Sequence, residues 1–390
     1  MNVQLPGWER IILRDICERI NYGYTASAKH EAIGPKFLRI TDIVPELIDW
    51  DSVPHCRIPS GEISKYLLQK GDIVIARTGA TSGYAKWIKN PPTSIFASYL
   101  VRLRIKPEYD SRYVGIVIES DIYKQFIKAN IGGAAQPQAN AQVLTSFPIM
   151  LPPLPTQCKI AAVLSAYDDL IENNTRRIRI LEQMAQAVYR EWFVHFRFPG
   201  HEGVRMVDGV PEGWEVVKLG DAVELAYGEG LKADKRQPGN VPVFGSGGLV
   251  GYHNQSLVKG PGIIVGRKGN VGSLFWSDED FFPIDTVFYV KSEVCLHYVF
   301  YNLQGQNFIN NDAAVPGLNR NQAYLLPFLL PTNQVVTQFQ EFITPIFAQS
   351  RNLRLRNANL RRTRDLLLPR LVGGEVDVEN LEIHTGGIEA

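Results

Sequence analysis

The sequence predicts a mixed α/β, or α+β, protein: two globular copies of one domain, related by a pseudo-two-fold axis and joined by two long antiparallel coiled-coil helices. Three observations predict this class. The second half of the chain repeats sequence patterns of the first half, an apolar stripe with helical spacing follows each copy, and prolines separate each copy from its stripe. At 390 residues and 45% hydrophobic content, the chain is long enough to bury two cores.

The internal repeat keeps both residue types and their spacings. The tripeptide Gly-Trp-Glu occurs at 7–9 and again at 213–215, followed in each case by Leu and Asp at the same offsets, Leu13 and Asp15 then Leu219 and Asp221. Later matches, in chain order, are Tyr22-Gly23 with Tyr227-Gly228, Arg77 and Gly79 with Arg267 and Gly269, and Tyr113-Val114 with Tyr298-Val299. Composition bias does not preserve order and spacing in this way, so the chain holds two copies of one domain.

Each copy is expected to mix strands and helices. Apolar β-branched runs bounded by Gly and Pro predict strands, and apolar residues at helical spacing predict a helix. The predicted elements are strands at 72–76 and 95–105 with a helix near 112–129, matched by strands at 262–266 and 286–291 with a helix near 295–310.

A long helix is predicted after each copy, beyond a proline cluster at 152–155 and beyond Pro331. Apolar positions alternate there in steps of four and three, the pattern of a coiled-coil seam. The predicted seam residues are Ile160, Leu164, Tyr167, Ile171, Asn174, Ile178, Leu181, Ala185, Val188 and Trp192, then Phe339, Ile343, Ile346, Leu353, Asn357, Leu360, Leu367 and Leu371. Each helix must bury its stripe, so we expect the two to pack together, antiparallel if each emerges from its own copy.

Polar residues and one proline interrupt these helices. Asn174 and Asn357 either meet near the middle and fix the register or are simply tolerated at partly exposed positions. Pro345 removes a backbone donor, which predicts a kink or a helix start. The predicted segments are a globular copy at 1–155, a helix at 156–197, a second copy at 198–336, a helix at 337–372 and an acidic tail at 373–390.

Composition argues against several protein classes. No apolar run approaches the length of a bilayer crossing and the N-terminus does not read as a secretory signal, so we expect a cytoplasmic protein. The four cysteines lie far apart and the histidines show no ligand spacing, so we expect neither disulfides nor a metal site. The net charge of +1 hides basic segments, since residues 337–371 hold seven arginines against two acids. Such a segment permits phosphate binding without establishing it.

A duplicated domain suits a partner that is itself two-fold related, and duplex DNA is the most familiar one. Helices of roughly 35 residues are about 50 Å long, enough to hold two domains about one DNA turn apart. A glycine-rich loop follows a buried strand in each copy, at 77–84 and 267–273, where Arg suits a guanine or a phosphate. The candidate DNA-binding residues are Lys29, Arg39, Arg77, Thr78, Gly79, Ser82, Tyr84, Lys232, Lys235, Arg236, Tyr252, His253, Asn254, Lys259, Arg267, Lys268 and Asn270. For any one of them the alternative is a structural role in a turn or at a sheet edge.

No catalytic motif is evident, and we predict no catalytic residue. Asn90-Pro91-Pro92-Thr93 is close to the Asn-Pro-Pro-aromatic motif of amino-methylating DNA enzymes, but Thr93 cannot stack on a flipped base. The second copy has no counterpart, and no phosphate-binding loop of the Gly-x-x-x-x-Gly-Lys-Ser/Thr type occurs. An autonomous DNA methyltransferase and a coiled-coil protein adaptor remain as alternatives to a DNA-reading subunit.

Over essentially its whole length the chain resembles the DNA-specificity subunit of type I restriction-modification systems. The fragments that carry the resemblance are Pro211-Glu212-Gly213-Trp214-Glu215 and the segments 37–42, 135–140, 243–248, 251–254 and 366–371. The resemblance implies two target-recognition domains, each reading one half of a split target, with the helices as a ruler between them. It also implies duplex DNA, two methylation subunits and restriction subunits as partners.

By the same resemblance this chain binds no cofactor itself. S-adenosylmethionine would sit on the methylation subunits, and ATP and Mg on the restriction subunits. The loops at 77–84 and 267–273 differ in sequence, so we predict two different half-sites and an asymmetric target.

Overall fold

The computed structural model describes residues 7–131, 139–308 and 317–385. It divides into two compact units, unit 1 comprising Met1–Asn173 with Asn357–Ala390 and unit 2 comprising Asn174–Arg356. The division passes through both long helices, α6 (Leu154–Tyr189) and α10 (Asn333–Val372), whereas the sequence-based segments set the helices apart from the globular copies. Three parts of the sequence-based predictions lie outside the described residues. They are residues 135–138 of the segment 135–140 that carries the family resemblance, residues 309–310 of a predicted helix and the last five residues of the acidic tail.

The described residues of unit 1 form three small sheets. An antiparallel pair joins β1 (Glu9–Ile12) to β8 (Pro148–Leu151). A four-stranded antiparallel sheet has the order β2 (Cys17–Tyr22), β7 (Leu100–Ile105), β4 (Ile73–Ala76) and β5 (Ala85–Trp87). A parallel pair joins β3 (Lys36–Leu38) to β6 (Ser94–Phe96). The shorter helices are η1 (Leu13–Ile16), α1 (Ile40–Ile43), α2 (Ser60–Tyr66), η2 (Gly79–Thr81), α3 (Ser111–Glu119), α4 (Asp121–Asn130) and α5 (Ala141–Leu144).

Unit 2 repeats this arrangement. β11 (Glu215–Lys218) pairs with β19 (Pro327–Leu330), and the four-stranded sheet has the order β12 (Glu224–Tyr227), β18 (Val287–Lys291), β15 (Gly262–Gly266) and β16 (Leu274–Ser277). β13 (Val241–Gly245) pairs in parallel with β17 (Phe282–Pro283) and, unlike its counterpart β3, also with β14 (Gly248–His253). The remaining elements are η3 (Arg190–Val194), η4 (His201–Gly203), β9 (Met206–Val207), β10 (Val210–Pro211), α7 (Leu219–Ala222), η5 (Ala233–Lys235), α8 (Leu296–Gln304) and α9 (Arg320–Tyr324). The duplication predicted from sequence is therefore a duplication of topology.

The repeated Gly-Trp opening has a structural reason in both units. Gly7 and Gly213 adopt φ values of +76° and +84°, and a Cβ on either would contact Pro153 or Thr332, just before the long helix of that unit begins. Trp214 is buried against Phe193 and Phe198, with ring centroids 5.8 and 5.0 Å apart. The turn therefore anchors the first strand of each copy beside the start of a long helix.

Three predicted elements differ from the structure. The predicted strand at 95–105 is two strands, β6 and β7, because the chain turns at Ala97 from the sheet of β3 to the sheet of β4. The predicted helix at 112–129 breaks at Ser120, whose extended backbone ends α3 and precedes α4. The predicted helix at 295–310 ends at Gln304, before Gly305. Pro345 does not start a helix, since α10 begins at Asn333.

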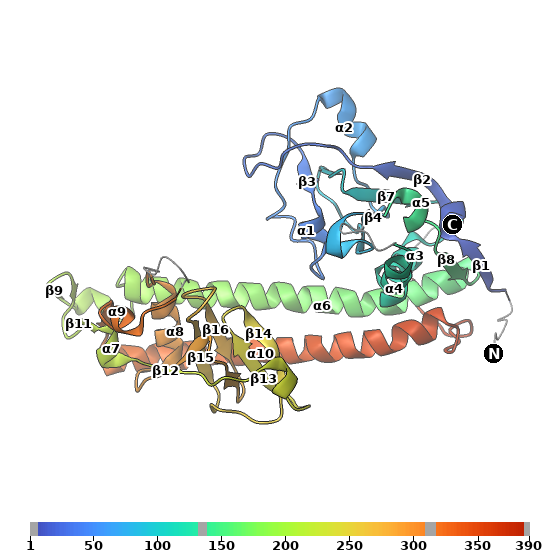
Figure 1. The fold of residues 1–390 in the computed structure, drawn as a ribbon. Helices are drawn as coiled ribbons and strands as arrows, with labels where there is room; N and C mark the ends of the chain where they lie inside the picture. The colour runs from blue at the N-terminus through green and yellow to red at the C-terminus, as the bar shows by residue number, and fades with distance from the viewer. Residues whose placement is uncertain (1–6, 132–138, 309–316, 386–390) are drawn as a thin grey trace. The chain divides into compact units, whose positions relative to one another are not determined.

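The long helices pack antiparallel within each unit (Figure 1). In unit 1 the amide of Asn357 donates to the carbonyl of Ile171 at 3.3 Å, and Arg364 lies 2.6 Å from Asp168. Later residues of α10 therefore contact earlier residues of α6. Unit 2 shows the same direction, since Arg354 contacts Glu182 and Phe339 lies beside Trp192. The predicted antiparallel coiled-coil arrangement is confirmed.

The seam positions are buried or half-buried throughout both helices. Asn174, Ser350 and Asn357 are buried as well, so the polar interruptions lie inside the helix pair instead of at its exposed edge. The described part of the acidic tail folds back onto unit 1, where Val378 is buried and Lys159 donates to the carbonyl of Glu379 at 2.7 Å.

Candidate nucleic-acid interface

The two glycine-rich loops predicted from sequence occupy equivalent places in the two units. In unit 1 the N–H of Arg77 donates to the carbonyl of Tyr99 at 3.0 Å, and the carbonyl of Arg77 accepts from Ala139 at 2.8 Å. In unit 2 Arg267 makes the corresponding bonds, its N–H to Thr286 at 2.9 Å and its carbonyl from Leu318 at 2.8 Å. We call residues 77–84 and 267–273 the arginine loops.

A second segment, the repeated Tyr-Gly turn, approaches the same place. A Cβ added to Gly23 would lie 2.2 Å from the carbonyl oxygen of Ala97, and one added to Gly228 would lie 2.2 Å from that of Ile284. Only glycine permits this backbone approach. In each unit, the Tyr-Gly turn, the arginine loop and the turn after the parallel strand pair therefore form one loop cluster, cluster 1 around Arg77 and cluster 2 around Arg267.

The loop arginines make contacts within the protein. The guanidinium of Arg77 lies 5.0 Å from the ring centroid of Tyr22, and that of Arg267 lies 5.2 Å from that of Tyr227. Arg267 also donates from Nε and Nη2 to the carbonyl of Asp285, at 3.1 and 2.5 Å. Both side chains are half-buried. Each arginine thus holds its loop against the Tyr-Gly turn. This is a structural role in a turn, which the sequence analysis gave as the alternative to DNA contact.

The other loop residues divide into exposed and engaged ones. Gly79, with φ of +74°, faces open space at the tip of the first loop, and Lys268 and Asn270 are exposed in the second. Thr78 is half-buried, and the hydroxyl of Ser82 donates to the carbonyl of Gly79 at 2.9 Å. Tyr84 is also half-buried, with the Nζ atom of Lys124 5.1 Å from its ring centroid. The tips therefore offer different surfaces in the two clusters, a bare glycine in one and a lysine with an amide in the other.

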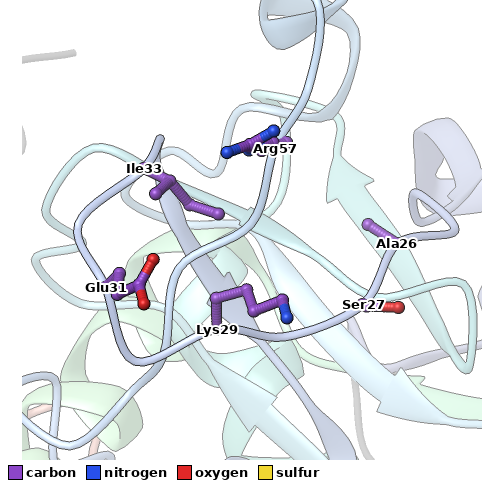
Figure 2. A pocket seen from close by; sticks show the side chains of 6 residues that line it. All are labelled: Ala26, Ser27, Lys29, Glu31, Ile33 and Arg57. Atoms are coloured by element: carbon purple, nitrogen blue, oxygen red, sulfur yellow. The ribbon is translucent and has the colours of Figure 1, made fainter.

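Lys29 lies in an open hollow of unit 1 (Figure 2). The hollow is lined by Ala26, Ser27, Lys29, Glu31, Ile33 and Arg57. Lys29 and Arg57 are exposed cations, and no carboxylate of the described chain lies within ion-pair distance of either. Arg39 is different, because its guanidinium binds both oxygens of Asp42 at 2.9 and 3.0 Å, and the same carboxylate accepts from the backbone N–H of Arg39 at the start of α1. The hydrogen bonds to Asp42 and the charge of its carboxylate raise the pKa of Arg39.

The remaining candidates of unit 2 lie before, within and after the strand pair β13–β14 in the chain. Lys232, Lys235, Tyr252 and Lys259 are exposed. Nη1 of Arg236 donates to the carbonyl of Val250 at 2.5 Å. His253 is buried and its Nδ1 accepts from the N–H of Gln237 at 3.0 Å, while the Asn254 amide donates to the Gln237 side chain at 2.8 Å. His253 and Asn254 therefore hold the segment of Arg236 and Gln237 against β14.

Two residues of the clusters were not among the sequence candidates. Tyr99 is 58% exposed beside Arg77, and Tyr22 is 43% exposed while its hydroxyl accepts from the N–H of Ala141 at 3.0 Å. The repeat contained the signal for Tyr22, since Tyr-Gly recurs at 227–228. Nothing in the sequence distinguishes Tyr99 from an interior strand residue, because it falls inside the run predicted as one continuous strand.

The basic segment of the second long helix is largely occupied by intramolecular ion pairs. In unit 1, Arg361 and Arg364 contact Glu46, and in unit 2, Arg351 and Arg354 contact Glu279 and Asp278. Burial alone would raise the pKa of Glu46, but hydrogen bonds and the charges of Arg361 and Arg364 outweigh it and hold that pKa below its usual value. These arginines attach each globular copy to its part of α10.

Asn90 to Thr93 form a surface turn between β5 and β6 in which Asn90 is exposed. Within residues 7–131, 139–308 and 317–385, no group of three or more His, Cys, Asp or Glu is placed to hold a metal ion. No helix of that same part of the chain is both long and apolar enough to cross a bilayer.

Comparison with known proteins agrees with this architecture. The family model of the type I restriction modification DNA specificity domain matches residues 6–183 and again residues 211–348, one match for each copy. The MjaIX specificity subunit of a type I restriction enzyme from Methanocaldococcus jannaschii is 26% identical over 360 residues, covering 82% of this chain and 81% of that protein. The HindI specificity subunit from Haemophilus influenzae is 21% identical over 476 aligned positions, covering 95% of this chain and all of that protein.

Among solved structures, the S subunit of a type I restriction-modification system from M. genitalium has a TM-score of 0.60 at 15% identity. The match covers 95% of this chain and 97% of that one. At that identity the likeness speaks for the fold. Two family matches that fall on two copies of one topology, each with an arginine loop and a share of the helix pair, show that this chain belongs to the family of type I restriction modification DNA specificity proteins.

Proposed function

We propose that this chain is the DNA sequence recognition subunit of a type I restriction-modification complex. Each globular copy reads one half of a bipartite target, and the antiparallel helices set the spacer between the halves. The observation that carries the proposal is the repetition of one topology with a loop cluster at the same place in each copy. One chain thereby presents two similar reading surfaces.

The two halves of the target are expected to differ. The loop clusters share their framework bonds, but the exposed tips carry Gly79 in one and Lys268 with Asn270 in the other. The segment after the first parallel strand also differs, being the short helix α1 in unit 1 and the hairpin of β13 and β14 in unit 2. Side chains that meet base edges decide sequence, so different tips favour an asymmetric target.

The chemistry of the complex belongs to other subunits in this proposal. Methylation subunits would supply S-adenosylmethionine, restriction subunits would supply ATP and Mg, and this chain would act without a catalytic residue in the cytoplasm. Two methylation subunits would dock on the long helices. In support, large apolar side chains are exposed along both helices, namely Leu170, Ile180 and Met184 on α6 and Phe342, Leu355 and Leu366 on α10. Exposed apolar surface of this kind marks protein interaction sites.

Footprinting of the complex with its methylation subunits tests the proposal. The target is a duplex carrying the split motif read from the methylome of the host, and the control is the same duplex with both half-sites scrambled. We expect two protected patches about one helical turn apart, and affinity that falls with salt because phosphate contacts release counterions. One continuous patch, or equal affinity for the scrambled duplex, would contradict the proposal. Affinity that is insensitive to salt would favour a protein adaptor instead.

A further inference from the structure

One structural difference between the two copies lies at the hairpin of β13 and β14. Among the described residues of unit 1, the counterpart strand β3 pairs with β6, and its other side makes only an isolated bridge from Lys36 to His55. In unit 2, β13 keeps the parallel partner β17 and gains β14 as an edge strand. Because the two copies share the rest of their topology, a segment that differs between them can give each copy a different DNA sequence preference.

A β-bulge shapes the exposed edge of this hairpin. Val243 pairs with Gly251 and Phe244 with Leu249, so Val250 is the extra residue without a partner on β13. Its carbonyl is satisfied by Nη1 of Arg236 at 2.5 Å. Gly251 makes room for that guanidinium, since a Cβ there would lie 2.7 Å from Nη1, and its φ of +142° disfavours other residues. The bulge is therefore held in place by Arg236.

The bulge brings three large apolar side chains to the surface together. Leu249, Val250 and Tyr252 are 50%, 42% and 54% exposed, whereas His253 beyond them is buried. Regular alternation along a strand would send neighbours to opposite faces, and the extra residue relaxes that constraint. Adjacent exposed apolar residues on a soluble domain indicate a binding surface.

This surface belongs to cluster 2. The hydroxyl of Ser273, in the arginine loop, donates to the carbonyl of Ser246 in the hairpin turn at 2.8 Å. The N–H of Ser246 in turn lies 3.4 Å from the hydroxyl of Thr286. The hairpin turn and the arginine loop are therefore neighbours in cluster 2.

The charges beside the hairpin favour a polyanion. Lys232 and Lys235 are exposed just before Arg236, and Lys268 is exposed in the arginine loop. No ion pair within the described chain holds any of these three lysines. Apolar side chains flanked by unpaired lysines match the major groove of DNA, in which the apolar thymine methyl groups lie among the base edges between two rows of phosphates. A docking site for another protein would not need this flanking charge.

We propose that the β13–β14 hairpin enters the major groove of the second half-site and that Leu249, Val250 and Tyr252 contact thymine 5-methyl groups there. The inference rests on the proposed function and makes it specific, because it places A·T pairs in the half-site read by unit 2. A two-stranded ribbon fits the major groove, about 12 Å wide, and thymine presents its methyl group only on that side.

Substitution of uracil for thymine tests the inference, because it removes only the methyl group. The probe is the target duplex bound by the complex of this chain with its methylation subunits. Uracil in the half-site of unit 2 should weaken binding about fourfold for each contacted methyl, the ratio that corresponds to roughly 0.8 kcal/mol for one buried methyl group. Leu249→Ser and Tyr252→Ser should bind the thymine duplex more weakly and lose part of the response to uracil. Val216→Ser, which changes an equally exposed apolar side chain on β11, should respond like the wild type.

The outcomes separate the inference from the function on which it rests. If the wild-type complex prefers its target to a scrambled duplex but ignores uracil in the half-site of unit 2, the inference is wrong and the function stands. If Leu249→Ser keeps the full response to uracil and instead loses the methylation subunits on purification, the hairpin docks a protein and the inference is again wrong. If the wild type does not prefer its target at all, the proposed function itself fails.

Discussion

Replacing the two loop arginines with alanine should have unequal effects on stability. Arg267 makes two hydrogen bonds to the carbonyl of Asp285 and lies 5.2 Å from the ring of Tyr227. Arg77 lies 5.0 Å from the ring of Tyr22, but no acceptor in the described chain reaches its buried Nε. The equivalent positions of the repeat therefore carry different numbers of contacts.

The expected magnitudes follow from those contacts. A hydrogen bond from a charged donor contributes about 1.5 to 2 kcal/mol in the lower part of its range, and a cation–π contact at a partly exposed site about 0.5 to 1 kcal/mol. Because the two bonds of Arg267 share one acceptor, we expect Arg267→Ala to lower the free energy of unfolding of unit 2 by about 2 to 3 kcal/mol. Arg77→Ala loses a single cation–π contact and removes an unsatisfied donor, so unit 1 should lose less than about 1 kcal/mol.

Thermal unfolding of the full chain measures the difference. For units of this size each kcal/mol shifts the midpoint by about 2 to 4 °C, so Arg267→Ala should lower its transition by about 4 to 12 °C and Arg77→Ala by less than about 4 °C. Arg267→Lys is the matched control, since it keeps the charge without the fork of donors, and should fall between wild type and alanine. Equal shifts for the two alanine variants would refute the contact-based reasoning.

The same variants report on DNA reading. If either arginine also leaves its ring to contact a base, alanine should relax the sequence choice of one half-site only, at a cost of roughly 1 to 3 kcal/mol in binding. Loss of affinity without loss of sequence choice would assign both arginines to the loop framework. Selection of preferred half-sites from a randomised duplex distinguishes the two results.

Other perturbations have outcomes that follow directly from the structure. Asp72→Asn should destabilise unit 1 by about 3 to 5 kcal/mol in chemical denaturation, because the Asp72 side chain is 1% exposed and Arg104 is left without its carboxylate partner at 2.9 Å. Gly228→Ala should destabilise unit 2 and expose cluster 2 to hydrogen exchange, since its Cβ would meet the Ile284 carbonyl at 2.2 Å, whereas alanine at Gly230, which faces open space, should not. The pKa of Glu46 is lowered in the folded chain from 4.5, so its stabilising contribution is present above that pH and is lost as pH falls through the folded value. The difference in unfolding midpoint between wild type and Glu46→Gln should therefore vanish in acid, and a difference that persists there would contradict the assignment. Removing one heptad from both long helices should change the spacer length in the target and leave the half-sites unchanged, as read by methylation of a library with varied spacers.

The sequence by itself determined the duplication, the order of the copies and the helix pair. The spacing of residues contained that information. The recurrence of Trp8 as Trp214 with the same neighbours indicates a repeated domain, and apolar positions three and four residues apart indicate a helix. The seam of α10 could be followed through the polar Asn357 for the same reason. The apolar pattern continues through the break at Ser120 and the turn at Ala97, so the helix and the strand predicted there were too long.

Only the tertiary structure decided which charged side chains are engaged and which remain open to a partner. Arg361 belongs to the basic segment of the second long helix, and its carboxylate partner, Glu46, lies 315 residues away in the chain. Arg77 meets Tyr22 and Arg236 meets the carbonyl of Val250 across strands that the sequence does not pair. The partner of a side chain depends on which distant segments come into contact when the chain folds. Residue type and local spacing do not determine those contacts.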